Sequence, residues 1–349
     1  MNIDSIDNVT VIGIGVMGPD ISLKFALSGY QVVGVDILSA AVEAAQVKVR
    51  RNLEQMVSGG MLSQVEAEQA LARLEFTLDW EAAVKRAHFV TEAVPEDLAI
   101  KKEVFSRCDG LLPPGIIIAS NTSSMSISQI SEGMRHPERA LGTHWTIPAH
   151  LSPMVEVIKG RKSADQFFDL AMALFQRMGK RPVPSRENPG FIHNYVQLAM
   201  VSAALDLVDA GLATPQDVDT VVKNGFGLRL SSVGPVEFVD MCGLDTILNI
   251  QRYMFQTTEN PVYKPSESIR EKVARGDLGV KSGKGFYDYQ REDSEDFWER
   301  TNRNIVALLQ SLARVAAAKL AGQPTPPAPN LVADPHLTEV SGRTVRQEG

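Results

Sequence analysis

A histidine and a glutamate, His144 and Glu156, stand close together in the stretch LGTHWTIPAHLSPMVEVI, residues 141–158. Histidine is the side chain best suited to accept a proton near neutral pH. A carboxylate that binds its other ring nitrogen fixes the tautomer and stabilises the imidazolium. The pair therefore suits a general base that takes a proton from a bound substrate. The alternative is that His144 is a polar residue that ends a strand.

Three glycines near the N-terminus have the spacing G-x-G-x-x-G. They follow the β-branched run NVTVIGI, residues 8–14, and open a helical stretch, and the next strand ends in an acid. This context predicts a dinucleotide site with the pyrophosphate at the helix N-terminus. The acid, Asp36, would bind the adenosine ribose and repel a 2′-phosphate, which favours NAD over NADP. The predicted cofactor contacts here are Gly13, Gly15, Val16, Met17, Gly18 and Asp36. The alternative is a glycine-rich turn beside a strand that ends in an aspartate.

Strand and helix patterns alternate from residue 8 to about residue 185. Further strands are predicted at residues 31–36, 88–94, 115–120, 139–145 and 154–160. Two helices, over residues 39–57 and 62–74, are separated by Ser-Gly-Gly and form a pair inserted into this alternation. The order predicts an α/β fold with a Rossmann-type, doubly wound and mostly parallel sheet.

The apolar spacing becomes helical after this region. We predict an NAD-binding domain over residues 1–185 and a separate all-α domain over residues 186–290. The second domain would bind substrate and form a homodimer, because its apolar helices exceed what about 100 residues bury alone. Residues 291–349 are expected to form an isolated helix followed by a Pro-rich, disordered tail.

Composition excludes several classes of function. The net charge of −7 argues against nucleic acid as a partner. No apolar run approaches the ~20 residues of a membrane span, so no membrane partner is expected. The acidic N-terminus is unlike a signal peptide, and Cys108 and Cys242 form no disulfide framework, which favours the cytoplasm. His150 has no further ligands at the usual spacing, so no metal site is expected.

Four further segments complete a pattern that covers residues 7 to about 290. They are ASNTSSMSIS at 119–128, GTHW…MVEVIKG at 142–160, NPGFIHN at 188–194 and VKSGKGFYDY at 280–289. In this order and spacing they resemble the L-3-hydroxyacyl-CoA dehydrogenase family, including its 3-hydroxybutyryl-CoA members. The resemblance implies NAD-dependent oxidation of a secondary alcohol. It also implies an active site of Ser123, His144, Glu156 and Asn194, where all four family residue types are present.

The resemblance assigns further roles. Ser123 and Asn194 would hydrogen-bond the reacting oxygen or a neighbouring carbonyl. Because Asn194 would come from the helical domain, we expect the site between the domains, at the carboxyl edge of the sheet. His193 is expected to face away from it. The implied additional cofactor contacts are Glu96, Lys101, Asn121 and Lys281.

The sequence departs from the family pattern at two places. Ile147 replaces an asparagine that follows the catalytic histidine, and the helix pair has Asn52, Gly59 and Met61 where family members contact coenzyme A. Arg50 and Arg51 could replace the missing contacts to coenzyme A only in part. The GLR and HW segments instead resemble relatives that act without coenzyme A on carnitine, gulonate or pyridine-ring substrates.

Three hypotheses therefore stay open. The first is a 3-hydroxyacyl-CoA thioester as substrate, and the second is a small hydroxy acid or a ring alcohol or aldehyde with the same chemistry. The third is a non-enzymatic, crystallin-like protein on this scaffold. The four intact active-site residues rank the third hypothesis last.

Overall fold

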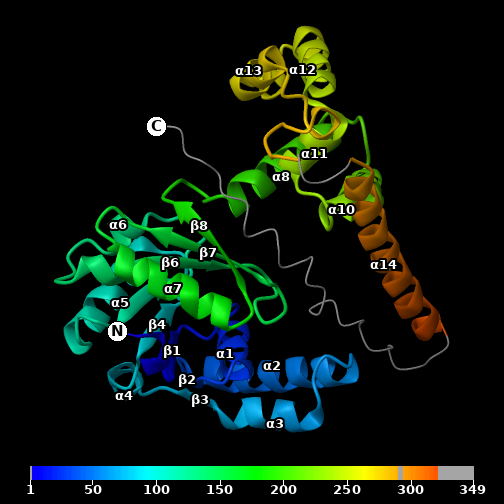
Figure 1. Ribbon diagram of the computed structural model, residues 1–349. Coiled ribbons are helices and arrows are strands. Elements are labelled where there is room, and N and C mark those ends of the chain that lie inside the picture. Colours follow the sequence, from blue (N-terminus) through cyan, green and yellow to red (C-terminus); the bar gives the residue numbers. More distant parts are fainter. Residues whose placement is uncertain (1, 290–293, 321–349) are drawn as a thin grey trace. The chain divides into compact units, whose positions relative to one another are not determined.

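The computed structural model describes residues 2–289 and 294–320 of the 349-residue chain (Figure 1). The described residues form two compact units, one up to Ala203 and one from Ala204 on. The domain boundary that the sequence places at residue 185 stays a prediction. The Pro-rich tail that we expect to be disordered begins beyond residue 320, outside the described residues.

An eight-stranded sheet forms the centre of the first unit, in the order β3-β2-β1-β4-β5-β6-β7-β8. Its strands are β1 Asn8–Ile12, β2 Gln31–Val35, β3 Leu74–Thr77, β4 Phe89–Glu92, β5 Ile117–Ser120, β6 Ala140–Trp145, β7 Met154–Lys159 and β8 Arg181–Arg186. Neighbouring strands are parallel except for β6 and β7, which are antiparallel. The strand order reverses between β1 and β4. The predicted Rossmann-type, mostly parallel sheet is confirmed.

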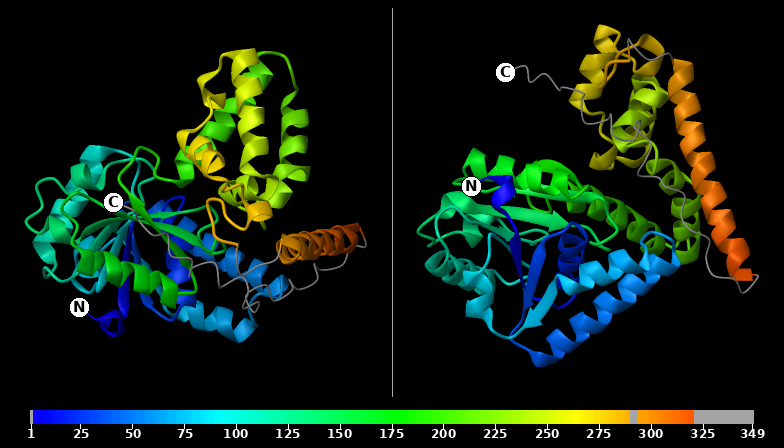
Figure 2. Two further views of the ribbon diagram at one scale, coloured as in Figure 1. Left: turned by 45° about the horizontal axis from the view of Figure 1, so that its top comes forward. Right: turned by 60° about the horizontal axis from the view of Figure 1, so that its bottom comes forward.

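Helices cover both faces of this sheet (Figure 2). One face packs against α1 Gly18–Leu27, α2 Ser39–Ser58, α3 Gln64–Ala72 and α7 Asp165–Arg177. The other face packs against α4 Trp80–Lys85, α5 Leu98–Leu111 and α6 Ile127–Ile130. Because both faces are covered, successive strand residues are buried rather than alternating between buried and exposed, as in β1 from Val9 to Ile12.

The predicted helix pair is present as α2 and α3, which lie side by side in Figure 2. α3 begins with a capping box, in which Ser63 and Glu66 satisfy each other's backbone N–H groups. This local signal explains why the chain restarts a helix directly after Gly59 and Gly60.

Two strands were missed from the sequence, and both lie at edges of the sheet. β3 begins at Leu74, which we assigned to the preceding helix. β8 contains Pro182 and Pro184, and proline is unfavourable in a central strand because it lacks an N–H. At an edge, however, the N–H groups that point away from the partner strand are not needed by the ladder.

The second unit is helical. Helix α8 His193–Asp209 leads into it, and it contains α9 Pro215–Asn224, α10 Phe226–Leu230, α11 Pro235–Cys242, α12 Leu244–Thr258, α13 Glu267–Arg275 and α14 Ser294–Leu320. Between residues 204 and 289 the β structure is limited to isolated bridges. The helical character that the sequence predicts for this part of the chain is therefore confirmed.

The long C-terminal helix α14 is not isolated as we expected. Phe297 is only 1% exposed, and it packs in a cluster with Val233, Val280 and Tyr289. Asn304 also donates a hydrogen bond to Ser232 Oγ at 3.2 Å. The start of α14 is thus part of the core of the second unit. Among the described residues, no helix combines the length and apolarity that crossing a membrane requires.

Candidate active site

The turn between β1 and α1 has the geometry of an anion cradle. Gly13 has a φ of +86°, and a Cβ there would lie 2.7 Å from the backbone N of Val94. A Cβ on Gly18 would lie 2.1 Å from the carbonyl oxygen of Gly13, so the helix can start this close only without a side chain. A Cβ on Gly15 would meet nothing within 4 Å, because this glycine faces open space. The turn therefore fits a dinucleotide pyrophosphate at the N-terminus of α1.

Asp36 is fixed at the end of β2 beside this turn. Its Oδ2 accepts a hydrogen bond from the backbone N–H of Ile14 at 3.0 Å. Its Oδ1 accepts bonds from the N–H groups of Ile37 at 2.8 Å and Leu38 at 3.2 Å. The carboxylate is thereby oriented at the edge of the pocket, where an adenosine ribose would meet it.

A pocket of about 970 Å³ opens at the carboxyl ends of the parallel strands, next to the β1–β4 reversal. All of its lining residues belong to the first unit. Those that the sequence predicted are Gly13, Gly15, Val16, Met17, Asp36, Glu96, Asn121, Ser123, His144 and Asn194. The pocket lies at the carboxyl edge, where the sequence places the site. Asn194 lies in the first turn of α8, which belongs to this unit by its contacts and to the predicted helical domain by its place in the sequence.

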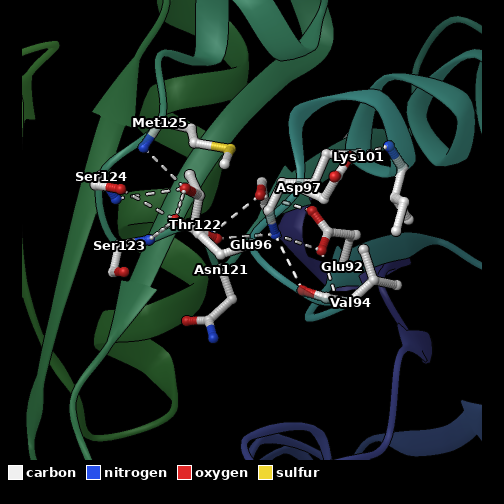
Figure 3. A network of polar contacts seen from close by, with 12 residues as sticks. Glu92, Val94, Glu96, Asp97, Lys101, Asn121, Thr122, Ser123, Ser124 and Met125 are labelled. Atoms are coloured by element: carbon white, nitrogen blue, oxygen red, sulfur yellow. Dashed lines mark hydrogen bonds and ion pairs between the residues drawn. The ribbon is translucent and has the colours of Figure 1, made fainter.

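A buried ion pair supports the loop that carries Ser123 (Figure 3). Lys101 is 1% exposed, and its Nζ lies 2.8 Å from Glu92 Oε1 and 3.3 Å from Glu96 Oε2. Glu96 accepts hydrogen bonds from Thr122 Oγ1 at 2.5 Å and from the N–H of Ser123 at 3.0 Å. Burial alone would raise the pKa of Glu96, but these bonds and Lys101 hold it below its ordinary value. Lys101 thus acts on the site through Glu96 and does not line the pocket.

The neighbouring polar residues are also held in place. Asn121 Oδ1 accepts a hydrogen bond from the N–H of Trp145 at 3.0 Å, which joins the ends of β5 and β6. Lys281 belongs to the second unit, where its Nζ lies 2.5 Å from Asp245 Oδ1. A cofactor contact by Lys281 stays a prediction.

His144 and Glu156 face each other across the antiparallel strands β6 and β7. His144 Nδ1 lies 2.7 Å from Glu156 Oε2, and the residues are 6% and 1% exposed. Burial would raise the pKa of Glu156, but hydrogen bonds from His144 and from two backbone N–H groups lower it below its usual value. The ionised carboxylate therefore keeps the proton of the neutral imidazole on Nδ1 and leaves Nε2 as the acceptor.

The segment NPGF forms a turn that completes this arrangement. Gly190 has a φ of +77°, and Phe191 has a φ of +51°, which is uncommon for a bulky residue. The turn directs the N–H groups of Ile192 and His193 to Glu156 Oε1, at 2.8 and 3.1 Å. These two charge-assisted bonds support the unusual backbone conformation.

The structure brings the four predicted active-site residues together. Asn194 Nδ2 donates a hydrogen bond to the carbonyl oxygen of Ser123 at 3.0 Å. Ser123, His144 and Asn194 all line the pocket, while Glu156 lies behind His144. A proton acceptor and two polar groups thus converge on the region where a glycine turn and Asp36 would hold a dinucleotide.

Sequence reasoning was wrong about His193. Its ring centroid lies 5.6 Å from that of His144, and it lines the pocket. Since α8 begins at this residue, His193 and Asn194 both lie on its first turn and both reach the pocket. Gln197, which also lines the pocket, was missed. Its spacing of four residues from His193 is the helical signal that could have found it.

Two family models match most of the chain. The 3-hydroxyacyl-CoA dehydrogenase NAD binding domain matches residues 8–188, and the C-terminal domain of the same enzymes matches residues 190–289. The chain belongs to the 3-hydroxyacyl-CoA dehydrogenase family. It is an NAD-dependent oxidoreductase, and the resemblance found in its sequence motifs is confirmed.

Relatives of this dehydrogenase differ in their named substrates. A 5-formyl-3-hydroxy-2-methylpyridine 4-carboxylate 5-dehydrogenase of Mesorhizobium japonicum is 33% identical over 310 residues, which cover 88% of this chain and 98% of that protein. A probable 3-hydroxybutyryl-CoA dehydrogenase of Bacillus subtilis is 34% identical over 289 residues, covering 83% and 99%. The solved 3-hydroxyacyl-CoA dehydrogenase of Archaeoglobus fulgidus is 31% identical with a TM-score of 0.74, covering 88% of this chain and 99% of that one.

The helix pair of this dehydrogenase departs from our expectation at Asn52. This residue, which we aligned with a coenzyme A contact, is 4% exposed, and its Nδ2 donates a hydrogen bond to Asp20 Oδ1 at 2.8 Å. Lys48 Nζ lies 3.1 Å from the same oxygen, and His150 Nδ1 lies 3.6 Å from Asp20 Oδ2. Asn52 therefore joins α2 to α1 and is not free to bind substrate.

Proposed function

We propose that this dehydrogenase transfers hydride reversibly between NAD and the hydroxyl-bearing carbon of a 3-hydroxyacyl substrate, with His144 as general acid and base. The observation that carries the proposal is the 2.7 Å contact between His144 Nδ1 and Glu156 Oε2. It leaves Nε2 as the one ring nitrogen able to take the hydroxyl proton. Bound NAD supplies the hydride acceptor.

Each polar residue has a part in this reaction. Nε2 of His144 takes the substrate hydroxyl proton, and Glu156 stabilises the imidazolium that forms. The Ser123 hydroxyl and the second amide N–H of Asn194 donate hydrogen bonds to the reacting oxygen or to the nearby acyl oxygen. In the direction of reduction, the imidazolium of His144 returns the proton to the reacting oxygen.

Two substrate classes fit this chemistry. The family assignment favours a coenzyme A thioester. The burial of Asn52 and the 54% exposed Met61, in place of groups that would contact coenzyme A, favour a free hydroxy acid or a ring alcohol or aldehyde. Arg50 and Arg51 are exposed and could bind phosphate in part.

A substrate screen that follows NADH absorbance tests the proposal. It should compare acetoacetyl-CoA with acetoacetate and with pyridine-ring aldehydes. The proposal is supported if the native enzyme turns over at least one of these compounds and His144→Ala abolishes that turnover. Undiminished turnover in His144→Ala would overturn the assigned role of the dyad.

We also propose that the enzyme is a homodimer built on α8. None of the residues of this helix is buried, although it is rich in apolar side chains. Tyr195, Leu198 and Leu205 are 66%, 58% and 55% exposed. Apolar surface of this kind on a helix is typical of a protein–protein interface.

The cytoplasm stays the expected location. Cys108 and Cys242 are both free thiols, which is consistent with a reducing compartment.

A further inference from the structure

His193 enters the pocket beside the catalytic histidine. Its ring centroid is 5.6 Å from that of His144, and the two rings make an angle of 70°. The backbone N–H of His193 is bonded to Glu156, at 3.1 Å. Because its main chain is anchored on the dyad itself, the His193 ring has a defined place next to the reacting position.

The ring of His193 has unused hydrogen-bonding capacity. Neither of its nitrogens has a protein partner among the described residues, and the side chain is only partly exposed. His144 and His150, by contrast, each face a carboxylate, from Glu156 and Asp20. A half-buried imidazole that lines a substrate pocket without a partner is available to a bound ligand.

Positive charge is otherwise scarce in this pocket. Of the described residues that line it, Arg107 is the single arginine or lysine. Its guanidinium lies 4.1 Å over the ring of Trp80. Trp80 is part of α4, and this helix contacts β2, the strand that Asp36 follows. The carboxylate of Glu156 already faces the imidazole of His144. His193 is therefore the remaining group near His144 that could balance a negative charge on the substrate.

We propose that His193 binds a carboxylate of the substrate close to the reacting carbon, so that the enzyme prefers a short hydroxy or oxo acid to the coenzyme A thioester of the same acid. This inference rests on the proposed function, since it names the substrate class of that site. Protonated imidazole donates two hydrogen bonds and carries the charge that a carboxylate needs. The carbonyl oxygen of a thioester is neutral, so its hydrogen bond to the imidazole is weaker than that of a carboxylate.

The rest of the chain is consistent with a free acid. Such a substrate does not need the helix pair to hold coenzyme A, and Asn52 there is committed to Asp20. The Mesorhizobium relative is named for a pyridine carboxylate. That name is a property of the relative; in this chain it is the imidazole of His193, without a partner among the described residues, that suits a carboxylate.

The experiment compares acetoacetate with acetoacetyl-CoA, each with NADH, in the native enzyme and in His193→Val. Hydrogen bonds to charged groups are about twice as strong as neutral ones. We expect kcat/KM for acetoacetate to fall roughly ten- to a hundredfold, mainly through KM, and that for the thioester to fall roughly two- to fivefold. His193→Gln, which keeps a neutral donor, should be intermediate with acetoacetate.

His136→Val is the matched control, since His136 is a half-exposed histidine that does not line the pocket. This variant should leave kcat/KM unchanged for both acetoacetate and acetoacetyl-CoA. Equal loss for the acid and the thioester in His193→Val would assign His193 to support of the dyad and overturn the proposal. An unchanged ratio of the two rates, with or without loss, would do the same.

A binding measurement separates this inference from the proposed function. Acetoacetate cannot react with the enzyme–NAD⁺ complex, so calorimetry measures its binding without turnover. Weaker binding in His193→Val than in the native enzyme would support the carboxylate site even if neither compound is reduced. Absence of turnover with the whole screen would count against the proposed function, whereas equal acetoacetate binding in both proteins would count against this inference.

Discussion

His144 and Glu156 are directly opposite each other on the antiparallel strands β6 and β7, with Nδ1 and Oε2 2.7 Å apart. Residues that pair in this way project to the same face of the sheet, so the register alone holds the carboxylate against the imidazole. The second oxygen of Glu156 is bound by the NPGF turn, which fixes the carboxylate from its other side. Because both oxygens of Glu156 are bound, the carboxylate holds the His144 imidazole in a fixed orientation for proton transfer.

The first prediction concerns this dyad. His144→Ala should lower kcat by ~10²–10⁴, the usual effect of losing a general base, while NADH binding stays unchanged. Glu156→Gln should lower kcat less and move the acid limb of the pH–rate profile for alcohol oxidation to lower pH. The direction follows because the neutral amide no longer stabilises the imidazolium, so the histidine loses its proton more readily. An acid limb that stays in place in Glu156→Gln would contradict the assigned role of the glutamate.

The second prediction concerns cofactor choice. Asp36→Asn removes the charge at the end of β2 and keeps one of the two oxygens that accept hydrogen bonds from the N–H groups of Ile14, Ile37 and Leu38. The native enzyme should bind NADH more tightly than NADPH, and the variant should narrow the difference because the 2′-phosphate is no longer repelled. Fluorescence titration with both dinucleotides measures it. Tighter binding of NADPH by the native enzyme would contradict the assignment.

The third prediction uses two glycines of the same turn. Gly15→Ala places a methyl group in open pocket space, so the protein should keep its Tm while Kd for NADH rises roughly tenfold. Gly18→Ala places the same methyl group 2.1 Å from the carbonyl oxygen of Gly13, so the fold itself should lose about 1–3 kcal/mol. Thermal unfolding and NADH titration of both variants separate the effects. An unchanged Kd for NADH in Gly15→Ala would contradict the role of Gly15 in binding the cofactor.

The fourth prediction concerns coenzyme A. If the thioester is used, Gly59→Lys on the exposed end of α2 should lower KM for acetoacetyl-CoA several-fold with little change in kcat. The reason is that one exposed lysine–phosphate contact contributes about 0.2–1 kcal/mol. The native KM for this thioester should be high and depend weakly on salt. A low-micromolar native KM would mean that Arg50, Arg51 or other groups already carry the phosphate contacts.

The fifth prediction concerns assembly. Light scattering should give a particle of about twice the 38.1 kDa chain mass. Leu198→Glu with Leu205→Glu places two charges on the exposed apolar face of α8 and should lower this mass. Leu212→Glu, at a leucine that is 75% exposed beyond the end of α8, is the control and should not. A native particle that scatters as a monomer at micromolar concentration would contradict the proposed dimer.

The sequence alone determined the features that depend on local pattern. The glycine spacing before α1, the acid after β2 and the helical periodicity beyond Gly190 each depend on residues that are neighbours in the chain. Short-range signals of this kind predict strands, helices and turns because backbone geometry repeats over a few residues. They predicted the sheet, the glycine turn and the helical second half of the chain. They failed at the edge strands β3 and β8, where the position of a strand in the sheet decides whether proline is tolerated.

Only the tertiary structure decided which side chains meet. Asn52 looks like a surface residue of an amphipathic helix, yet the packing of α2 on α1 buries it against Asp20. His193 looks like a neighbour turned away from Asn194, yet the NPGF turn starts α8 so that both reach the pocket. The β6–β7 register, and not the sequence interval, brings Glu156 to His144. Such contacts join residues far apart in the chain, so they follow from the packing of whole elements and not from any local preference.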